Sequence, residues 1–312
     1  MIDDWNEQKS AAFGRETLCF RHRLGERALF TDEALAGILD RYPRERLGIY
    51  TMGEDLADWQ SWRRGAADQL SGRDLLAAVK AGRLWLNLRN TDKHLPEFAD
   101  ICTEIAADKE RHVQGLRVFN RDLGLLISSP GAMVFYHLDV PLSSLWQVRG
   151  EKRIWFYPRS DPFVSDAQIE RFVRRQAEGQ FAFDPTWDAA ATSIQMKPGD
   201  MVTWVQNAPH RVVNGPMLNV SLSMEFMTPA AALRANVLYA NGLLRQRLGA
   251  RPRVQSGLGP AALAKVALAR VVKATTRRPR SYKAILPATF TLDAREPGVL
   301  RPAPITEDAL AA

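Results

Sequence analysis

The chain contains few cysteines and no long apolar run. Its two cysteines, Cys19 and Cys102, stand far apart among 312 residues. Neither a disulfide framework nor a paired-cysteine zinc site fits this spacing, so we expect a reducing compartment. A run of about 18 apolar residues, which a membrane-spanning helix needs, is not present. Residues 1–10 are acidic and polar, whereas a signal peptide is basic and then apolar. We therefore expect a cytoplasmic protein without a membrane partner.

Acidic residues are missing from a long segment near the C-terminus. Between Phe226 and Leu292 there are twelve Lys or Arg and no Asp or Glu, while the whole chain carries a net charge of +7. The positive field of this segment could attract an anionic partner. Its candidate contact residues are Arg251, Arg253, Lys265, Arg270, Lys273, Arg277, Arg278, Arg280 and Lys283. Because no helix-turn-helix, zinc finger or stacking platform is recognisable, we favour a solvated basic surface over nucleic-acid binding.

Three residues in two segments could hold a metal ion. His137 and Asp139 stand two positions apart in an apolar run. Alternate side chains of a β-strand share a face, so this imidazole and this carboxylate would point into the same space. His210 is the candidate for the third ligand. Two histidines and one carboxylate, with the opposite positions open, suit Fe(II) that also binds a cosubstrate and O₂. The alternative is a core histidine beside a turn-capping aspartate.

Polar residues accompany these candidate ligands. Lys152 follows a tight turn around Gly150, from which its ammonium could enter the same cavity; a surface lysine after a hairpin is the alternative. Four polar side chains share one face of a later strand: Asn219, Ser221, Ser223 and Glu225. An unpaired buried polar group costs about 1–3 kcal/mol, so this face indicates a wet, ligand-filled cavity. The alternative is a face that points to solvent.

Read in order, these pieces resemble a known family. They are His137-x-Asp139, Gly150-x-Lys152, Lys197-Pro198-Gly199-Asp200, Pro209-His210 and the Asn-Val-Ser-Leu-Ser run of residues 219–223. The combination resembles the jumonji-C and cupin-like Fe(II)- and 2-oxoglutarate-dependent oxygenases, among them bacterial cupin-like proteins and the asparaginyl hydroxylase that acts on hypoxia-inducible factor. It covers residues 124–228, about a third of the chain. Gln206 is a departure, because many relatives carry proline there.

The resemblance implies a mainly β fold with added helices, built on a double-stranded β-helix (cupin or jelly-roll) barrel. It implies that His137, Asp139 and His210 are catalytic as the ligands of Fe(II). It also implies that Lys152 pairs with the distal carboxylate of the cosubstrate 2-oxoglutarate. We expect further cosubstrate contacts from Ser143, Asn219, Ser221 and Ser223.

The segments around the barrel have readable helix and strand signals. Residues 1–123 are expected to be an α/β region that wraps the barrel, with a helix over 31–42 and another over 73–81 that starts with a capping box at Ser71 and Asp74. Leu84, Leu86 and Leu88 alternate with Trp85 and Asn87, which indicates a strand over 83–88. The barrel core is expected at residues 124–228, and a further helix is expected over 96–109.

An insertion and a C-terminal region complete the expected organisation. Residues 159–193 interrupt the barrel, with a helix over 165–176. The aromatic side chains of Phe181, Phe183 and Trp187 could select substrate at the mouth of the barrel or seal its wall. Residues 229–312 are expected to hold helices and a basic tail. One apolar stripe, made of Leu233, Val237, Ala240, Leu244 and Leu248, could pack on the barrel or form a homodimer. A second helix is expected over 260–275.

The favoured hypothesis is an Fe(II)/2-oxoglutarate-dependent dioxygenase that uses O₂. It would hydroxylate or demethylate a protein side chain or a small metabolite. The alternative is a cupin barrel that binds a metal or a small ligand without redox chemistry, with a regulatory role for a polyanion-binding C-terminal segment.

Overall fold

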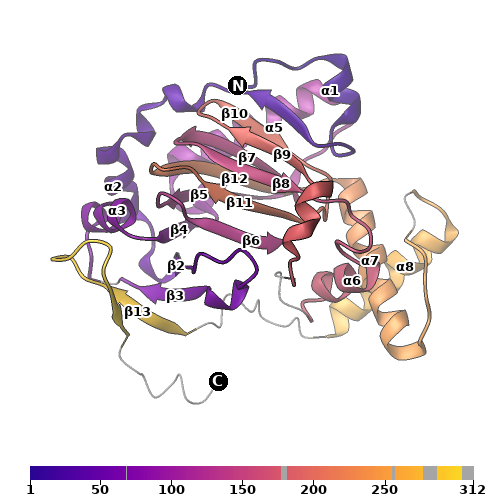
Figure 1. Cartoon of the computed structure of the whole chain (residues 1–312). Coiled ribbons are helices and arrows are strands. Elements are labelled where there is room, and N and C mark those ends of the chain that lie inside the picture. Colours follow the sequence, from indigo (N-terminus) through magenta and orange to yellow (C-terminus); the bar gives the residue numbers. More distant parts are fainter. Residues whose placement is uncertain (68, 177–180, 255–256, 277–286, 304–312) are drawn as a thin grey trace.

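Strands from the middle of the chain form two facing sheets (Figure 1). The larger sheet holds, in this order across it, β10 (Asp200–Thr203), β7 (Leu142–Arg149), β12 (Asn219–Met227) and β5 (Phe119–Ser128). The smaller sheet holds β6 (Met133–His137), β11 (His210–Asn214), β8 (Lys152–Phe156) and β9 (Thr192–Met196). Within β5–β12, consecutive strands lie in opposite sheets, except for β8 and β9, which share the smaller sheet. This arrangement is a double-stranded β-helix, so the expected fold class is confirmed.

The computed structural model describes residues 1–67, 69–176, 181–254, 257–276 and 287–303. The larger sheet continues past both edges of the barrel. β1 (Leu18–Arg21) lies beside β10, and beyond β5 follow β4 (Leu84–Leu88), β2 (Leu47–Thr51), β3 (Arg63–Ala66), β13 (Ala288–Leu292) and β14 (Leu300–Pro302). β13 pairs in parallel with β3. The sequence indicated only a basic tail after residue 275, because no local pattern shows which strand a distant segment joins.

The helices lie on both sides of the barrel (Figure 1). They are α1 (Glu7–Ala12), α2 (Asp32–Arg41), α3 (Gly72–Ala81), α4 (Thr91–His94), α5 (Pro96–His112), α6 (Asp166–Val173), α7 (Pro229–Leu248) and α8 (Pro260–Thr275). The short 3₁₀ helices are η1 (Leu24–Glu26), η2 (Ala28–Phe30), η3 (Arg44–Arg46), η4 (Trp59–Ser61) and η5 (Pro185–Ala190).

Capping residues fix the starts of the helices that the sequence predicted. The Thr31 hydroxyl accepts a hydrogen bond from the Ala34 backbone N–H and so starts α2. Ser71 and Asp74 form the expected capping box of α3. Each cap satisfies backbone N–H groups that have no partner inside the helix. These contacts are local, and for this reason the boundaries could be read from the sequence.

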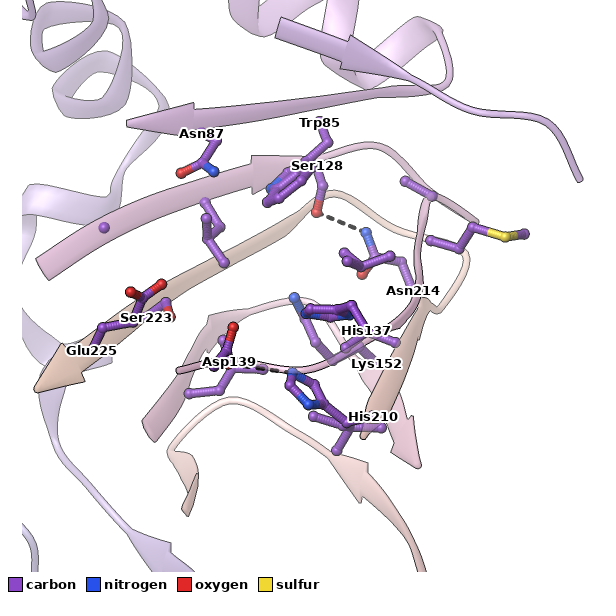
Figure 2. Close-up of a pocket in the computed structure, with 18 of the residues that line it drawn as sticks. Trp85, Asn87, Ser128, His137, Asp139, Lys152, His210, Asn214, Ser223 and Glu225 are labelled. Carbon is purple, nitrogen blue, oxygen red and sulfur yellow. Dashed lines mark hydrogen bonds and ion pairs between the residues drawn. The ribbon is translucent and has the colours of Figure 1, made fainter. Parts of the chain in front are cut away.

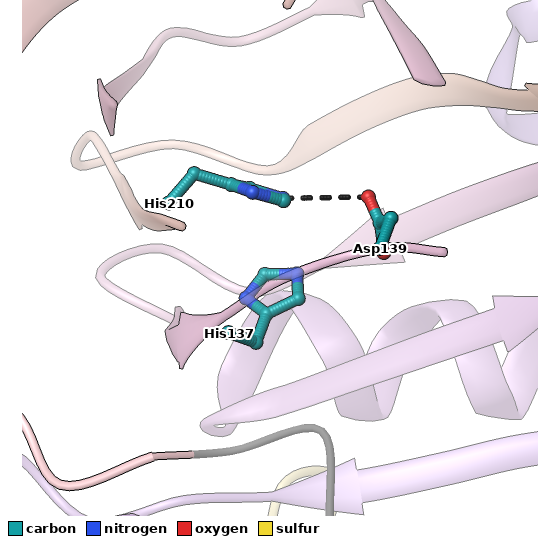
Figure 3. Close-up of side chains that lie close together, drawn as sticks. All are labelled: His137, Asp139 and His210. Atoms are coloured by element: carbon teal, nitrogen blue, oxygen red, sulfur yellow. Dashed lines mark ion pairs between the residues drawn. The ribbon is translucent and has the colours of Figure 1, made fainter. Parts of the chain in front are cut away.

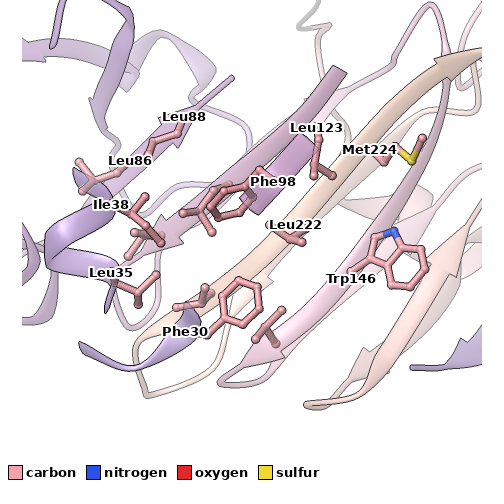
Figure 4. Close-up of a cluster of buried hydrophobic side chains, with 14 of the residues drawn as sticks. Phe30, Leu35, Ile38, Leu86, Leu88, Phe98, Leu123, Trp146, Leu222 and Met224 are labelled. Atoms are coloured by element: carbon pink, nitrogen blue, oxygen red, sulfur yellow. The ribbon is translucent and has the colours of Figure 1, made fainter. Parts of the chain in front are cut away.

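The main hydrophobic core lies on the outer face of the larger sheet, under α2, α3 and α5 (Figure 4). Leu222 and Met224 of β12 and Leu86 of β4 are fully buried there. Their neighbours along the strands point the other way, so Trp85 and Asn87 line the interior of the barrel. The predicted alternation along residues 83–88 is confirmed. Burying a side chain of this size contributes about 1.5–3 kcal/mol to stability.

The insertion covers the outer face of the smaller sheet. Phe181 and Phe183 are buried against Tyr136, Tyr157 and α6, and Trp187 is partly buried beside them. Of the two roles considered for these aromatic residues, their packing supports sealing of the wall. The Leu238 side chain of α7 belongs to the same cluster.

The C-terminal helices pack mainly on each other and on α6. The predicted stripe on α7 was wrong at its end, because Leu248 is 72% exposed, whereas Leu238 and Leu243 are buried. Leu263 and Val271 of α8 are exposed. A homodimer through these helices stays a prediction, as do the domain boundaries at residues 123 and 228.

The described residues include only part of the basic segment. Arg251 and Arg253 are exposed, while Arg277, Arg278, Arg280 and Lys283 lie outside the described residues. Polyanion binding stays a prediction. Within the described ranges, no helix has the length and apolar character that crossing a membrane requires.

Lys109 of α5 is a charged group inside the main core. Its side chain is fully buried, and its ammonium donates a hydrogen bond to the Ser144 hydroxyl at 2.8 Å and lies 4.5 Å from the centre of the Phe226 ring. Burial lowers the pKa of Lys109 to about 7, against an ordinary value of 10.5. Between these two pH values the unfolded chain binds more protons than the folded protein. The free energy of unfolding therefore rises with pH across this window.

We predict that Lys109→Met raises the free energy of unfolding by about 1–3 kcal/mol near pH 7, because it removes a poorly solvated charge and keeps the side-chain length. The variant should also lose much of the increase in stability between pH 7 and pH 10. Urea unfolding at several pH values measures both effects. Lys80→Met, at an exposed ion pair with Asp32, is the matched control. A less stable variant at every pH contradicts the prediction.

Candidate metal centre

The pairing of β6 with β11 brings the two candidate histidines together. His137 ends β6 and stands opposite His210, the first residue of β11. Their ring centres are 4.1 Å apart. Asp139 lies beyond the end of β6, in the loop that leads to β7, and not on the strand as the sequence indicated. Figure 3 shows that its carboxylate still turns toward the same point as both rings.

The three side chains are close enough to share one ion. Each offers a ligand atom, and the three atoms lie within 4.8 Å of one another. The Nε2 atom of His210 is 3.6 Å from the Oδ2 atom of Asp139. Two nitrogens and one oxygen on one side, with the cavity on the other, fit the donor set expected for Fe(II). Their roles as metal ligands stay a prediction from the sequence, and this geometry is compatible with that prediction.

Backbone carbonyls orient both imidazole rings. The Nδ1 atom of His137 is 2.7 Å from the Phe135 carbonyl oxygen, and that of His210 is 3.1 Å from the Ala208 carbonyl oxygen. A carbonyl oxygen only accepts, so in each neutral ring Nδ1 carries the hydrogen and the lone pair lies on Nε2, the atom that would bind a metal. Burial lowers the pKa of His210, although Asp139 opposes this. The neutral form that binds metals is therefore favoured.

The ligands open into a polar cavity of about 130 Å³ between the two sheets (Figure 2). Asn214 stands opposite Lys152 in the pairing of β11 with β8, and its amide donates a hydrogen bond to the Ser128 hydroxyl at 2.8 Å. At one end of the cavity, across from Asp139, lie Ser223 and Glu225.

An ion-pair network lines the Glu225 end of the cavity. Arg89 contacts the Glu225 carboxylate at 3.0 Å and that of Asp122 at 2.5 Å. Burial raises the pKa of Glu225, an effect that Arg89 opposes. One guanidinium thus contacts two carboxylates at this end of the cavity.

Lys152 is buried in the cavity. It is 4% exposed, and burial lowers its pKa to about 7. No carboxylate or hydrogen-bond acceptor among the described residues stabilises its ammonium. The alternative of a surface lysine is wrong. A buried cation is costly unless an anion accompanies it, so the position fits an anionic ligand.

A glycine turn delivers Lys152 to this position. Gly150 joins β7 to β8 with a φ of +73°. A Cβ at this residue would lie 2.3 Å from the Leu218 carbonyl oxygen. Only glycine fits both conditions, so the turn is tight and Lys152 starts β8 facing inward.

Of the other predicted cosubstrate contacts, only Ser223 lines the cavity. Ser143 donates a hydrogen bond to Asp139 Oδ2 at 3.0 Å, which holds the carboxylate in place. Ser221 and Asn219 are fully buried, and each hydrogen-bonds the Gln147 side chain at 2.7 Å. The alternative of a solvent-facing strand is therefore wrong at these two residues. Their binding of a cosubstrate stays a prediction that their present contacts do not favour.

Sequence reasoning missed Asn214, Ser128, Trp85 and Asn87 as cavity residues. Asn214 stands four residues after His210 on the same strand, a spacing that puts both on one face. Trp85 and Ser128 are opposite each other in the pairing of β4 with β5. The alternation was visible in the sequence, but the pairing was not.

Solved structures share this fold. No family model and no curated protein matches the sequence. The X-ray structure of Escherichia coli YcfD superposes with a TM-score of 0.50 at 16% identity, over 88% of this chain and 69% of that chain. YcfD, a ribosomal oxygenase, in complex with cobalt and 2-oxoglutarate gives 0.46 at 15%, over 88% and 69%. Its complex with cobalt and succinic acid gives 0.45 at 15%, over 91% and 70%. At these identities, the first comparison establishes a shared fold.

We predict that His137→Ala, Asp139→Ala and His210→Ala each weaken Co²⁺ binding by more than about 100-fold, because each removes one of three ligands while second-sphere changes alone cost 10–100-fold. Isothermal titration of the purified protein with Co²⁺ measures this. His94→Ala is the matched control, since His94 packs against Tyr42 away from the cavity. Unchanged affinity in the His210 variant excludes the site.

Proposed function

We propose that this chain is an Fe(II)- and 2-oxoglutarate-dependent oxygenase. One observation carries the proposal. A cluster able to hold Fe(II) and a buried ammonium that has no partner among the described residues occupy the same cavity. A metal site alone would suit many cupin barrels, whereas the lone Lys152 calls for a ligand with a carboxylate at a distance from the metal.

Each group in the cavity has a distinct task in this proposal. His137, Asp139 and His210 hold the metal and leave its cavity side open. With 2-oxoglutarate and O₂, bound Fe(II) supplies the oxidation of a substrate C–H bond, and the cosubstrate leaves as succinate and carbon dioxide. Lys152 holds the far carboxylate by a charge-assisted hydrogen bond, the stronger kind in a dry site.

Apolar side chains separate this chemistry from bulk water. Leu126, Ile154, Trp204 and Val212 form part of the cavity lining. Exclusion of water strengthens each electrostatic contact inside and limits side reactions.

The substrate that we propose is a protein side chain or a small metabolite, and hydroxylation and demethylation are equally compatible with the cavity. The end that carries Ser223 and Glu225 faces Asp139 and would meet the substrate. Its hydroxyl and carboxylate oxygens favour a substrate group that donates hydrogen bonds. The E. coli protein of the same fold is called a ribosomal oxygenase. For this chain, both substrate classes belong in the first screen.

We predict that the purified protein forms succinate from 2-oxoglutarate with Fe(II) and O₂, at a rate that rises with a true substrate. Succinate can be followed by NMR or mass spectrometry. The His137→Ala variant controls for iron-driven background. If Fe(II) and 2-oxoglutarate bind but no succinate forms with any substrate tested, the non-redox cupin alternative is favoured.

We predict that Lys152→Met weakens 2-oxoglutarate binding by about 100-fold and leaves Co²⁺ affinity within a few-fold of wild type. Loss of one partner of a buried charge pair costs about 2–5 kcal/mol, and every 1.4 kcal/mol is tenfold. Anaerobic titration of the Co²⁺-loaded protein with 2-oxoglutarate measures the effect. Lys80→Met is the surface control. Equal affinity for 2-oxoglutarate would show that the ammonium has another role.

A further inference from the structure

The loop that carries Asp139 has no strand pairing of its own. Residues 138–141 lie between β6 and β7, outside both strands. The backbone at Asp139 is therefore not held by the strand hydrogen bonds that fix His137 and His210. Another part of the chain must fix this loop if the carboxylate is to stay in register with the two rings.

A second loop, between β10 and β11, supplies the missing contacts. The Asn207 amide donates a hydrogen bond to the Asp139 carbonyl oxygen at 2.8 Å. The neighbouring Gln206 amide donates to the Val140 carbonyl oxygen at 2.7 Å and to the Ala231 carbonyl oxygen at 3.2 Å. Asn207 is 1% exposed. Two side-chain amides thus hold the backbone of the ligand loop.

Asn207 has a conformation that suits this task. Its φ is +62°, in the left-handed region that asparagine tolerates better than most residues. This conformation turns the chain just before His210. One residue therefore shapes the approach to one candidate ligand and bonds the backbone of another.

A helix of the C-terminal layer contacts the same amide. The Arg234 guanidinium of α7 donates through Nε to the Asn207 Oδ1 atom at 3.3 Å. Asn207 thus accepts from α7 on one side and donates to the Asp139 loop on the other. These bonds fix the orientation of the amide, because its oxygen accepts from Arg234 while its nitrogen donates to the Asp139 carbonyl oxygen and, at 3.5 Å, to that of Val140.

We propose that Asn207 is a positioning residue that sets Asp139 at the metal, and that Arg234 acts on the metal centre through Asn207. The proposal rests on the metal site of the proposed function and adds residues to it that do not touch the metal. Partners of this kind typically change metal affinity by 10–100-fold when removed.

Two substitutions separate positioning from folding. Asn207→Gly removes the amide and accepts the positive φ without strain. Asn207→Asp keeps an acceptor for Arg234 but loses the N–H donor. Its added negative charge would by itself attract a cation, so weaker binding in this variant would reflect the lost bond.

The experiment is a Co²⁺ titration of each full-length variant, with the melting temperature of the metal-free protein measured beside it. We expect both variants to bind Co²⁺ about 10–100-fold more weakly than wild type. The matched controls are Asn120→Gly and Asn120→Asp, at an exposed asparagine with a φ of +48°. A lower melting temperature with unchanged Co²⁺ affinity would mean that Asn207 only shapes the turn, which overturns the proposal.

A double-mutant cycle tests the role of Arg234. Arg234→Met should weaken Co²⁺ binding several-fold in the wild-type background and have no further effect in the Asn207→Gly background, where its partner is gone. Equal effects in both backgrounds would show that Arg234 acts by another route. If the wild-type protein binds no Co²⁺, the proposed function itself fails, an outcome distinct from normal binding by the Asn207 variants.

Discussion

The pairing of β6 with β11 is the interaction on which the metal centre depends. It places His137 directly opposite His210 at the end of the smaller sheet. Side chains alternate between the faces of a strand, so a slip of one residue would turn one ring out of the cavity. The same strand β11 pairs with β8 on its other side, where Asn214 stands opposite Lys152. One strand thus fixes the position of His210 at the candidate metal centre and stands beside Lys152.

The two faces of the larger sheet differ in composition: one packs in the hydrophobic core and the other lines the polar cavity. Its outer face carries the leucines, methionines and aromatic rings of the main core. Its inner face carries Ser223, Glu225 and Asn87, which add little to stability by packing. Buried charges in this interior would destabilise the fold if the cavity held no ligand. They are reasonable in a cavity that is completed by a cation on one side and an anion beside Lys152.

The sequence was most informative where the determining contacts are local. The spacing of His137 and Asp139, the turn at Gly150 and the capping box at Ser71 involve neighbours in the chain, and all can be read without a structure. Cavity residues supplied by strand pairing could not be found in this way. Trp85 reaches the cavity because β4 extends the sheet beside β5, and β13 joins β3 across more than half of the chain. Ser143 was predicted to contact the cosubstrate; it lies beside the candidate metal centre, where its hydroxyl donates to Asp139.

Asp139 lies in the loop between β6 and β7. Because this ligand lies outside the strands, its placement depends on contacts from Asn207, Gln206 and Ser143 and not on the sheet alone. Gln206 also reaches the first turn of α7 through the Ala231 carbonyl oxygen, and Arg159 of the insertion donates to the Gln206 carbonyl oxygen at 2.7 Å. The insertion and the C-terminal helices therefore meet at the loop that holds the carboxylate. A shift of this loop would move the Asp139 carboxylate relative to the two rings of the candidate metal centre, because His137 and His210 are fixed by the paired strands.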